Sequence, residues 1–409
     1  MNEYRAQIPH GGRWGLRARR LFDGEAFHAG APLVVVSGDR ISEVDLAGNG
    51  VSADLPIVDL GDVTLLPGLI DAHVHLAFDP AGDVVMQMQA DPDGVLLQRM
   101  HRHAQAALRA GITTVRDLGD RSYLASVLRE RYLTEAQAGP QILVAGPPIT
   151  RRGGHCWFLG GEADTPEELA AAVTERVARG VDVIKVMATG GVITPGCQPY
   201  ESQYGPAELK LIADAAHRAG VPATAHAHGN PGIADAVAAG MDGIEHCFFR
   251  TKQGISLDLQ TVAALAETGV YVSTTTARPP GELPADSVQS RENFARMHRA
   301  GVRLVCSSDA GVAPFKPHDC LPHGVVEFGA RLGLTSAQAL ASVTSLAAQA
   351  CTVGDRKGRI APGYDADLLA VAGNPAADLP AILHPTAIYR AGHRCDTPDA
   401  ARRESLDHR

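Results

Sequence analysis

The sequence has few cysteines, and none of them is spaced for metal binding. Seven cysteines occur in 409 residues, which is an odd number, and no two of them form a CxxC pattern. This arrangement argues against a framework of disulfides and against a zinc site built from thiolates. A chain of this length can form a hydrophobic core without such crosslinks. We therefore expect the protein to reside in a reducing compartment, the cytoplasm.

The sequence also lacks a long apolar run and an excess of basic residues. Glycine, proline or charge interrupts its apolar stretches well short of a membrane span, and the first residues, MNEYRAQIPHGGRWGL, lack the apolar segment of a signal peptide. The formal net charge is -9, with 37 lysines and arginines against 46 aspartates and glutamates. We therefore expect a soluble, unexported protein with no nucleic-acid or membrane partner. The expected partner is a small-molecule substrate, and a homo-oligomer is left open.

The composition is that of a globular protein, with 45% hydrophobic and 20% charged residues, and the length suits one large domain or two. Short β-like segments between glycine, aspartate and proline occupy residues 13–66, and a second β-rich stretch follows GRIAPGYDAD near the other end. We expect both ends to form one small β-sandwich subdomain, residues 1–66 with 357–409, beside a central domain of residues 67–356.

The central domain repeats a strand followed by a helix, which is the pattern of βα units and a parallel sheet. The eight predicted strands contain TLLPGLIDAHVH, ITTVRDLG, QILVAG, DVIKVMATG, PATAHAHG, GIEHC, VYVSTTT and RLVCSSDAG. The predicted helices include GVLLQRMHRHAQAALRAG, TPEELAAAVTERVARG, GPAELKLIADAAHRAG and NPGIADAVAAG. Several of these begin with a capping residue or proline and end at glycine. Eight such units predict an α/β fold of the (β/α)8 TIM-barrel class.

Potential metal ligands lie in the predicted strands, mostly where the strands end. They are His73 and His75 in the first strand, Lys185 in the fourth, His226 and His228 in the fifth, His246 in the sixth and Asp309 in the eighth. In a barrel, the carboxyl ends of all strands surround one cavity. Two histidines at positions i and i+2 of a strand also face the same side, so both can bind one ion.

A single histidine at a strand end is most often a hydrogen-bonded structural residue. Histidines that end strands one, five and six, together with an aspartate that ends strand eight, favour a metal site instead. Histidine-rich ligands favour zinc, although manganese or cobalt can replace it. Lys185 lies in the apolar run VDVIKVM, where a cation is costly to bury. It is either paired with a carboxylate or kept as a neutral amine, which can react with carbon dioxide to form a metal-bridging carbamate.

Seven motifs carry a family resemblance: PGLIDAHVHL, GITTVRDLGD, VIKVMATGG, TAHAHG, GIEHC, SSDAG and GRIAPGYDADLLAVAGNP. They resemble the metal-dependent amidohydrolase superfamily, in particular its branch of Xaa-Pro dipeptidases and imidazolonepropionase-like proteins, in the family order and over nearly the whole chain. The resemblance implies two zinc ions bridged by a carboxylated lysine. The ligands it implies are His73, His75 and Asp309 at one ion, His226 and His246 at the other, and Lys185 as the bridge. It gives His228 a supporting or substrate-binding role.

The same resemblance implies metal-assisted hydrolysis. Two metal ions would lower the pKa of a shared water and polarise the carbonyl, and Asp309 would take the proton from the water and pass it to the leaving amine. The loop ITRRGGHCWFLGGEAD resembles the family's glycine-rich loop, in which a histidine, here His155, polarises the scissile carbonyl. An ordinary flexible surface loop is the alternative interpretation.

The substrate contacts are less defined by the sequence. Candidates for an anionic pocket that binds a substrate carboxylate are Arg116, Arg151, Arg152, Tyr200 and Tyr204, and each also fits a structural role. The favoured function is hydrolysis of a dipeptide or an N-acyl amino acid. Cleavage of a cyclic amide and deamination of a small heterocycle are alternatives that the same superfamily supports. A non-catalytic binding barrel is a third hypothesis, and the retention of all six ligand positions argues against it.

Overall fold

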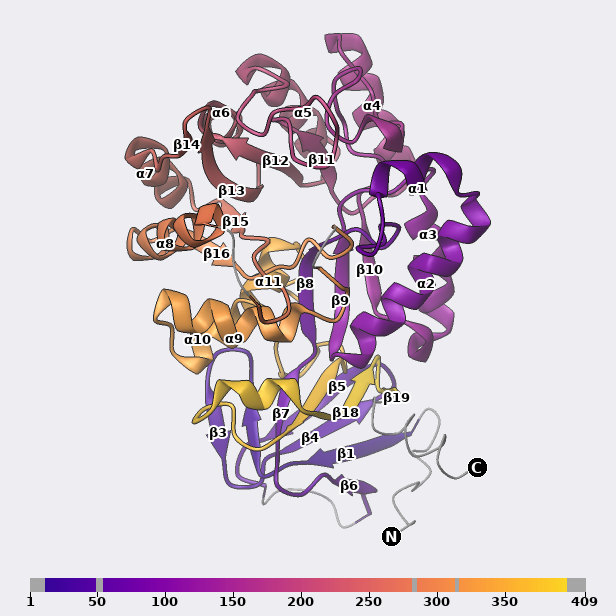
Figure 1. Cartoon of the computed structure of the whole chain (residues 1–409). Coiled ribbons are helices and arrows are strands. Elements are labelled where there is room, and N and C mark those ends of the chain that lie inside the picture. The colour runs from indigo at the N-terminus through magenta and orange to yellow at the C-terminus, as the bar shows by residue number, and fades with distance from the viewer. Residues whose placement is uncertain (1–11, 49–53, 282–284, 313–315, 396–409) are drawn as a thin grey trace.

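The computed structural model describes residues 12–48, 54–281, 285–312 and 316–395 and has a mixed α/β fold. Figure 1 shows two parts, namely sheets built from both ends of the chain and a larger array of parallel strands with helices around it. Residues 1–11, 49–53 and 396–409 of the predicted end subdomain lie outside the described residues. Within the described ranges, no helix is both long enough and apolar enough to cross a membrane.

Two sheets contain the strands near the chain ends. The first has the order β5-β4-β1-β6 and contains β1 (Arg13–Arg17), β4 (Leu33–Ser37), β5 (Arg40–Asp45) and β6 (Ile57–Asp59). The second has the order β19-β18-β17-β7-β2-β3 and contains β2 (Arg20–Phe22), β3 (Phe27–Ala29), β7 (Val63–Pro67), β17 (Leu368–Ala372), β18 (Pro385–Arg390) and β19 (His393–Cys395). One buried apolar cluster joins the two sheets, with the rings of Trp14 and Tyr389 5.6 Å apart. Segments from opposite ends of the sequence therefore share one core.

Each of the eight predicted strands of the central domain overlaps an observed parallel strand. One group has the order β10-β9-β8 and contains β8 (Leu69–Val74), β9 (Ile112–Asp117) and β10 (Gln141–Val144). The other has the order β11-β12-β13-β15-β16 and contains β11 (Ile184–Met187), β12 (Ala223–Gly229), β13 (Gly243–Thr251), β15 (Tyr271–Ser273) and β16 (Arg303–Val305). The short β14 (Gly254–Ile255) pairs antiparallel with β13.

Isolated parallel bridges join the two groups of strands at both of their edges. Ile149, which follows β10, pairs with Val186 of β11, and Val74 of β8 pairs with Ala310, which follows β16. The backbone N–H of Asp309 also donates to the carbonyl of His73 at 2.8 Å. One junction thus links the segment after β10 to β11, and the other links β8 to the segment after β16, which is distant from it in sequence.

Helices follow most of the parallel strands and cover them. They are α1 (Val84–Ala90), α2 (Asp93–Arg109), α3 (Leu124–Thr134), α4 (Pro166–Ala178), α5 (Pro206–Arg218), α6 (Asn230–Ala238), α7 (Leu259–Thr268), α8 (Ala285–Arg299), α9 (Leu321–Leu332), α10 (Ser336–Ala341) and α11 (Ser345–Ala350). Short 3-10 helices are η1 (Ala136–Ala138), η2 (Trp157–Leu159) and η3 (Leu379–Leu383). In α2, Leu96, Met100 and Ala104 recur every four residues and are buried in the main core. This spacing places them on one face of the helix.

Several predicted strands differ in their bounds from the observed ones. The segment TLLPGLIDAHVH forms two strands, because the chain leaves the end sheet at Pro67 and begins β8 at Leu69. Gly68 lies at this change, where an added Cβ would come within 2.1 Å of the Thr113 hydroxyl. Strands β15 and β16 are shorter than VYVSTTT and RLVCSSDAG predict. Asp309 therefore lies in a loop beyond β16.

Candidate metal centre

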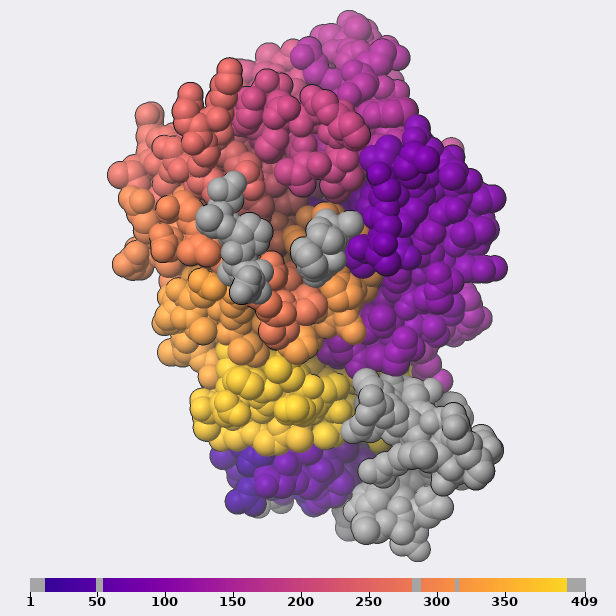
Figure 2. Space-filling view, viewed as in Figure 1, coloured from indigo at the N-terminus to yellow at the C-terminus, as the bar shows by residue number. Residues whose placement is uncertain are grey.

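A cavity of about 350 Å³ is lined by residues of β8, β11, β12 and β13 and of the loops that follow β11, β15 and β16. In Figure 2, purple segments near α1 and orange segments that follow β15 and β16 meet around a hollow near the centre of the visible face. The predicted metal ligands, together with His155 and His228, line the cavity: His73, His75, His155, Lys185, His226, His228, His246 and Asp309.

The first set of donor atoms belongs to His73, His75 and Asp309. One ligand atom from each lies within 4.8 Å of the others. Asp309 Oδ1 is 3.4 Å from His73 Nε2 and 3.5 Å from His75 Nε2. The Nδ1–H of His75 donates to the Gly119 carbonyl at 3.1 Å, so its Nε2 lone pair faces Asp309. Three ligand atoms that lie this close together can bind a single divalent ion.

The loop that carries Asp309 is held against β8 by buried contacts. The Ser308 hydroxyl donates to Asp71 of β8, and the Ser308 backbone N–H donates to Asp71 Oδ1 at 3.1 Å. Burial raises the pKa of Asp71 to about 7 despite these hydrogen bonds. Residues 237 positions apart are thereby fixed beside each other.

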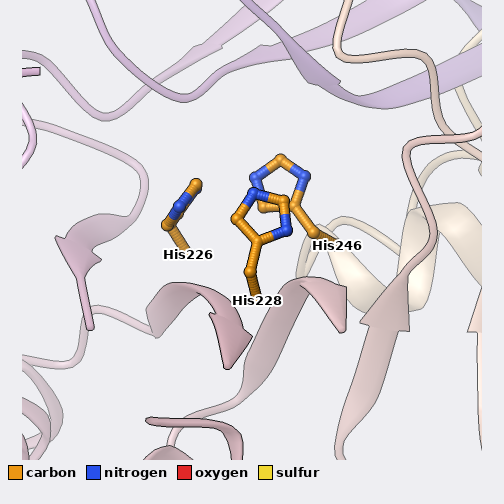
Figure 3. Close-up of side chains that lie close together, drawn as sticks. All are labelled: His226, His228 and His246. Carbon is orange, nitrogen blue, oxygen red and sulfur yellow. The ribbon is translucent and has the colours of Figure 1, made fainter. Parts of the chain in front are cut away.

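The second set of donor atoms belongs to His226 and His228 of β12 and His246 of β13. Figure 3 shows these three rings together, and one ligand atom from each lies within 4.8 Å of the others. The rings of His228 and His246 stack with centroids 4.4 Å apart. The Nε2–H of His226 donates to the Gly190 carbonyl at 3.0 Å, which leaves its Nδ1 for a metal. His228 Nδ1 is buried and has no hydrogen-bond partner among the described residues.

All five histidines of the two sets are neutral at neutral pH. Burial, followed by the charge of Lys185, lowers the pKa of His73 to about 4 and of His75 to about 3. Burial also lowers the pKa values of His226, His228 and His246 well below the usual value. Because metals bind the neutral imidazole, the site needs no deprotonation of these rings before it binds an ion.

The amine of Lys185 is buried in the same cavity without a partner. Its side chain is 1% exposed, and Nζ has no hydrogen bond to any part of the chain that the structure describes. Burial lowers the pKa of this amine from 10.5 to about 8. The sequence left open an ion pair between Lys185 and a neighbouring carboxylate, and no such pair forms among these residues. Without a partner of opposite charge, an ammonium group is costly to bury.

The sequence did not identify Glu245, which accepts a hydrogen bond from one of the predicted ligands. Its carboxylate is fully buried and accepts hydrogen bonds from His73 Nδ1 at 2.7 Å, Arg116 Nη2 at 3.0 Å and the Thr224 hydroxyl at 2.7 Å. The bond from Nδ1 fixes the tautomer of His73 and turns Nε2 toward the cavity. One feature of the sequence could have identified Glu245, namely an acidic residue inside the apolar strand GIEHC. Arg116, a substrate-pocket candidate, instead pairs with this carboxylate.

Three residues around the donor sets have left-handed backbone conformations. The φ angles are 71° for His246, 60° for Asp309 and 50° for Thr275. Such angles cost a non-glycine residue of the order of 1–3 kcal/mol. The hydroxyl of Thr275 lies 2.9 Å from His246 Nδ1, so the strained segments also orient a ligand. This clustering is typical of functional sites.

The structure places the remaining predicted substrate residues in different surroundings. His155 lines the cavity, with Nδ1 3.1 Å from the Thr194 hydroxyl. Arg151 and Arg152 are exposed and do not line the cavity, and Arg152 binds Asp164 and Glu168. The expectation that these arginines form the anionic pocket is therefore not supported.

The two predicted tyrosines also lie outside the cavity lining. Tyr204 is buried, and its hydroxyl donates to the Ala163 carbonyl at 2.7 Å. Tyr200 is partly exposed, and its backbone packs against Gly229. The cations that line the cavity are instead Arg250, Arg278, Arg291 and Lys316, besides Lys185. None of these four was identified from the sequence.

A family model, two curated proteins and a crystal structure are each similar to this chain over most of its length. Residues 64–392 match the family model described as the Amidohydrolase family. Ochratoxinase of Aspergillus niger is 27% identical over 394 residues, which cover 85% of this chain and 80% of that protein. Imidazolonepropionase of Hahella chejuensis is 25% identical over 407 residues, which cover 87% and 92%. A crystal structure of a Xaa-Pro dipeptidase with methionine bound in its active site matches with a TM-score of 0.82 and 27% identity, over 94% of this chain and 99% of that one.

Proposed function

This chain belongs to the amidohydrolase family and hydrolyses a C–N bond in a small molecule, and from this premise we propose that the bond is the amide of a dipeptide or an N-acyl amino acid. Two sets of metal-binding donors in one cavity with an unpartnered lysine amine carry the proposal. The methionine in the active site of the similar Xaa-Pro dipeptidase supports an amino acid as part of the substrate.

The residues of the cavity fit two divalent ions, zinc in preference. His73, His75 and Asp309 would hold one ion, and His226 and His246 would hold the other. We retain His226 as the ligand and His228 as a residue that faces the substrate. Lys185 fits a bridging role, because a buried amine of lowered pKa and without a partner can form a carbamate with carbon dioxide. When bound, the ions would activate water and polarise the substrate carbonyl.

Asp309 would transfer the proton, and His155 would polarise the scissile carbonyl. Asp309 points Oδ1 at the first ligand set, and its Oδ2 lies 3.5 Å from Lys316 Nζ. This carboxylate can accept a proton from a water in the cavity and return it to the leaving amine. Burial lowers the pKa of His155 to about 3, and its Nδ1 can accept from Thr194. The neutral ring can then donate its Nε2–H to the scissile carbonyl oxygen.

We further propose that the eight parallel strands close into a (β/α)8 barrel spanning residues 67–356. The bridges at both junctions support closure. Residues 1–66 with 357–409 would form the β-sandwich subdomain, which the pairing of β7 with β17 supports. A cytoplasmic location and a small molecule as the partner remain predictions from the sequence, and the oligomeric state stays open.

A second candidate is hydrolysis of a cyclic amide or deamination of a small heterocycle. The similarity to imidazolonepropionase, whose name indicates an imidazolone substrate, favours this alternative. A rate screen across dipeptides, N-acyl amino acids, lactams and aminated heterocycles separates the two, with metal analysis of the same preparation. We expect two ions per chain and the highest kcat/KM among the linear amides. Exclusive turnover of lactams or heterocycles would favour the second candidate, and two bound ions without any turnover would favour a binding protein.

A further inference from the structure

The loop that follows β11 is closed at its base by backbone pairing. It comprises residues 188–203, and we call it the β11 loop. Thr189 forms an antiparallel bridge with Ser202, and the backbone N–H of Gln203 donates to the Ala188 carbonyl at 2.8 Å. A loop whose ends lie together in this way is a compact element. The β11 loop can therefore hold its own side chains in defined positions.

The beginning of the β11 loop is bonded to the second ligand set. The Gly190 carbonyl accepts a hydrogen bond from His226 Nε2 at 3.0 Å. The hydroxyl of Thr189 accepts one from the backbone N–H of His228 at 3.1 Å and donates to the Gly190 carbonyl at 2.9 Å. These contacts fix the loop to β12, the strand that carries both histidines.

The same loop also contacts His155, which lies in the loop after β10. Gln203 Oε1 accepts from the backbone N–H of His155 at 2.5 Å, and Gln203 Nε2 donates to the Met187 carbonyl at 2.8 Å. The hydroxyl of Thr194 lies 3.1 Å from His155 Nδ1. A Cβ added to Gly191 would come within 2.3, 2.5 and 2.7 Å of three atoms of the His155 ring. The ring therefore packs directly against the backbone of the β11 loop.

The hydrogen bonds of the Thr194 hydroxyl determine which partner donates to the other. The backbone N–H of Cys156 donates to Thr194 Oγ1 at 2.9 Å. Thr194 is buried, and the described residues provide the proton of its hydroxyl with no acceptor other than His155 Nδ1. Because a buried donor without an acceptor is costly, the hydroxyl donates to Nδ1. The neutral imidazole then carries its own proton on Nε2.

We propose that Thr194 is a positioning residue that holds His155 in the tautomer with the proton on Nε2. This inference rests on the proposed function, in which the Nε2–H of His155 polarises the scissile carbonyl. The opposite tautomer would have a lone pair on Nε2, which could bind a metal ion but could not donate to a carbonyl oxygen. The rings of His155 and His226 have centroids 4.6 Å apart. The β11 loop thus fixes the hydrogen-bond donor beside the second ligand set.

Nitrogen-15 NMR of the metal-free protein measures the tautomer without turnover. Protonated and unprotonated ring nitrogens have different chemical shifts, and the signals that disappear in His155→Asn belong to His155. We expect the proton on Nε2 in the wild type and in Thr194→Ser, which keeps a hydroxyl, and a mixture of tautomers in Thr194→Val. A proton on Nδ1 in the wild type would overturn the inference, even if the enzyme hydrolyses linear amides.

Kinetics of the zinc-loaded enzyme test the consequence, with leucyl-phenylalanine and N-acetyl-phenylalanine as substrates. Removing a donor to a reacting carbonyl costs about 10²–10³-fold in kcat. Misplacing that donor should cost less, so we expect kcat to fall by about tenfold in Thr194→Val, with a smaller change in KM. Thr194→Ser should restore most of the rate. Thr174→Val removes an exposed hydroxyl on α4 and is the matched control, which should equal the wild type.

A double variant separates positioning from a general effect on the fold. In a His155→Ala background, Thr194→Val should cause no further loss of kcat, because Thr194 acts through the ring that is missing. Circular dichroism and metal content establish that each variant is folded and loaded. A further loss as large as in the wild-type background would overturn the positioning role. If neither amide is hydrolysed by the wild type, the proposed function fails, and the NMR measurement still decides the tautomer.

Discussion

Replacing Glu245 with glutamine tests whether this buried carboxylate holds the first ligand set in place. The carboxylate accepts three hydrogen bonds, from His73, Arg116 and Thr224, and is fully buried. Burial raises its pKa, but Arg116 and His73 outweigh burial and hold the pKa below its usual value. Glutamine keeps the shape, removes the charge and turns one accepting atom into a donor that faces another donor.

The expected magnitude follows from two separate losses. Removing one partner of a buried ion pair costs roughly 3–5 kcal/mol, because the Arg116 guanidinium stays buried without its counter-charge. Weakening the hydrogen bond that orients a metal-binding histidine lowers metal affinity by about 10–100-fold. Thr224→Val is the matched control, since it removes one hydrogen bond to the same carboxylate and leaves its bond to His73 intact. We expect it to cost about 1–3 kcal/mol and to spare the metal affinity.

Two measurements check these values. Urea unfolding of the metal-free proteins, followed by circular dichroism, gives the change in unfolding free energy. Competition with a chelator of known affinity gives the zinc dissociation constant. Glu245→Gln would refute the reasoning if its stability lay within about 0.5 kcal/mol of wild type, the range of a surface substitution, and its zinc affinity were unchanged. A loss of the same size in Thr224→Val for both quantities would assign the effect to general packing.

The remaining predictions concern the cavity itself. Lys185→Ala should lose metal and nearly all activity, and short carboxylic acids should restore part of both; full metal content and rate would contradict a carbamate bridge. In metal-free, carbonate-free buffer, the pKa of Lys185 is about 8 in the folded protein against 10.5 for the ordinary amine, so the unfolded chain binds more protons between these values. The stability of wild type relative to Lys185→Met should therefore rise from pH 8 to pH 10.5, and a flat difference in urea midpoints would argue against the shift. Asp309→Asn should keep most of its metal while kcat falls by about 10²-fold or more; near-normal turnover would eliminate the proton-transfer role. In Gly191→Ala the new Cβ would come within 2.3 Å of His155 Nε2, so kcat/KM should fall at constant metal content, while Gly94→Ala, with open space around it, should match wild type in the same assays.

The sequence predicted the parallel strands and the histidines and aspartate that the structure gathers around one cavity, because each depends on local patterns. Apolar runs followed by helices mark the strands, and His73 and His226 lie in motifs at strand ends. The bond between Arg116 and Glu245 could not be predicted in this way. It joins residues 129 positions apart, and only the register of the assembled strands brings them together.

The positions of Arg151 and Arg152 outside the cavity lining could not be predicted for a related reason. Arg151 and Arg152 are close to His155 in sequence, but the loop turns at Gly153, where φ is 67°. Arg152 therefore forms ion pairs with Asp164 and Glu168 outside the cavity. Arg250 was missed because the predicted strand GIEHC ends four residues before the observed β13. Left-handed residues interrupt that extension, and apolar side chains rarely adopt such a conformation.

The contact between Ser308 and Asp71 also determines when the site can exist. A ribosome makes the segment that contains His73 and His75 first, and Ser308, in the loop of Asp309, follows 237 positions after Asp71. At about 5–20 residues per second, synthesis of the intervening chain takes roughly 12–50 s. During that time the two histidines have no aspartate partner. The complete donor set therefore forms only after most of the chain has been made, and an ion that needs all three donors would bind only late in synthesis.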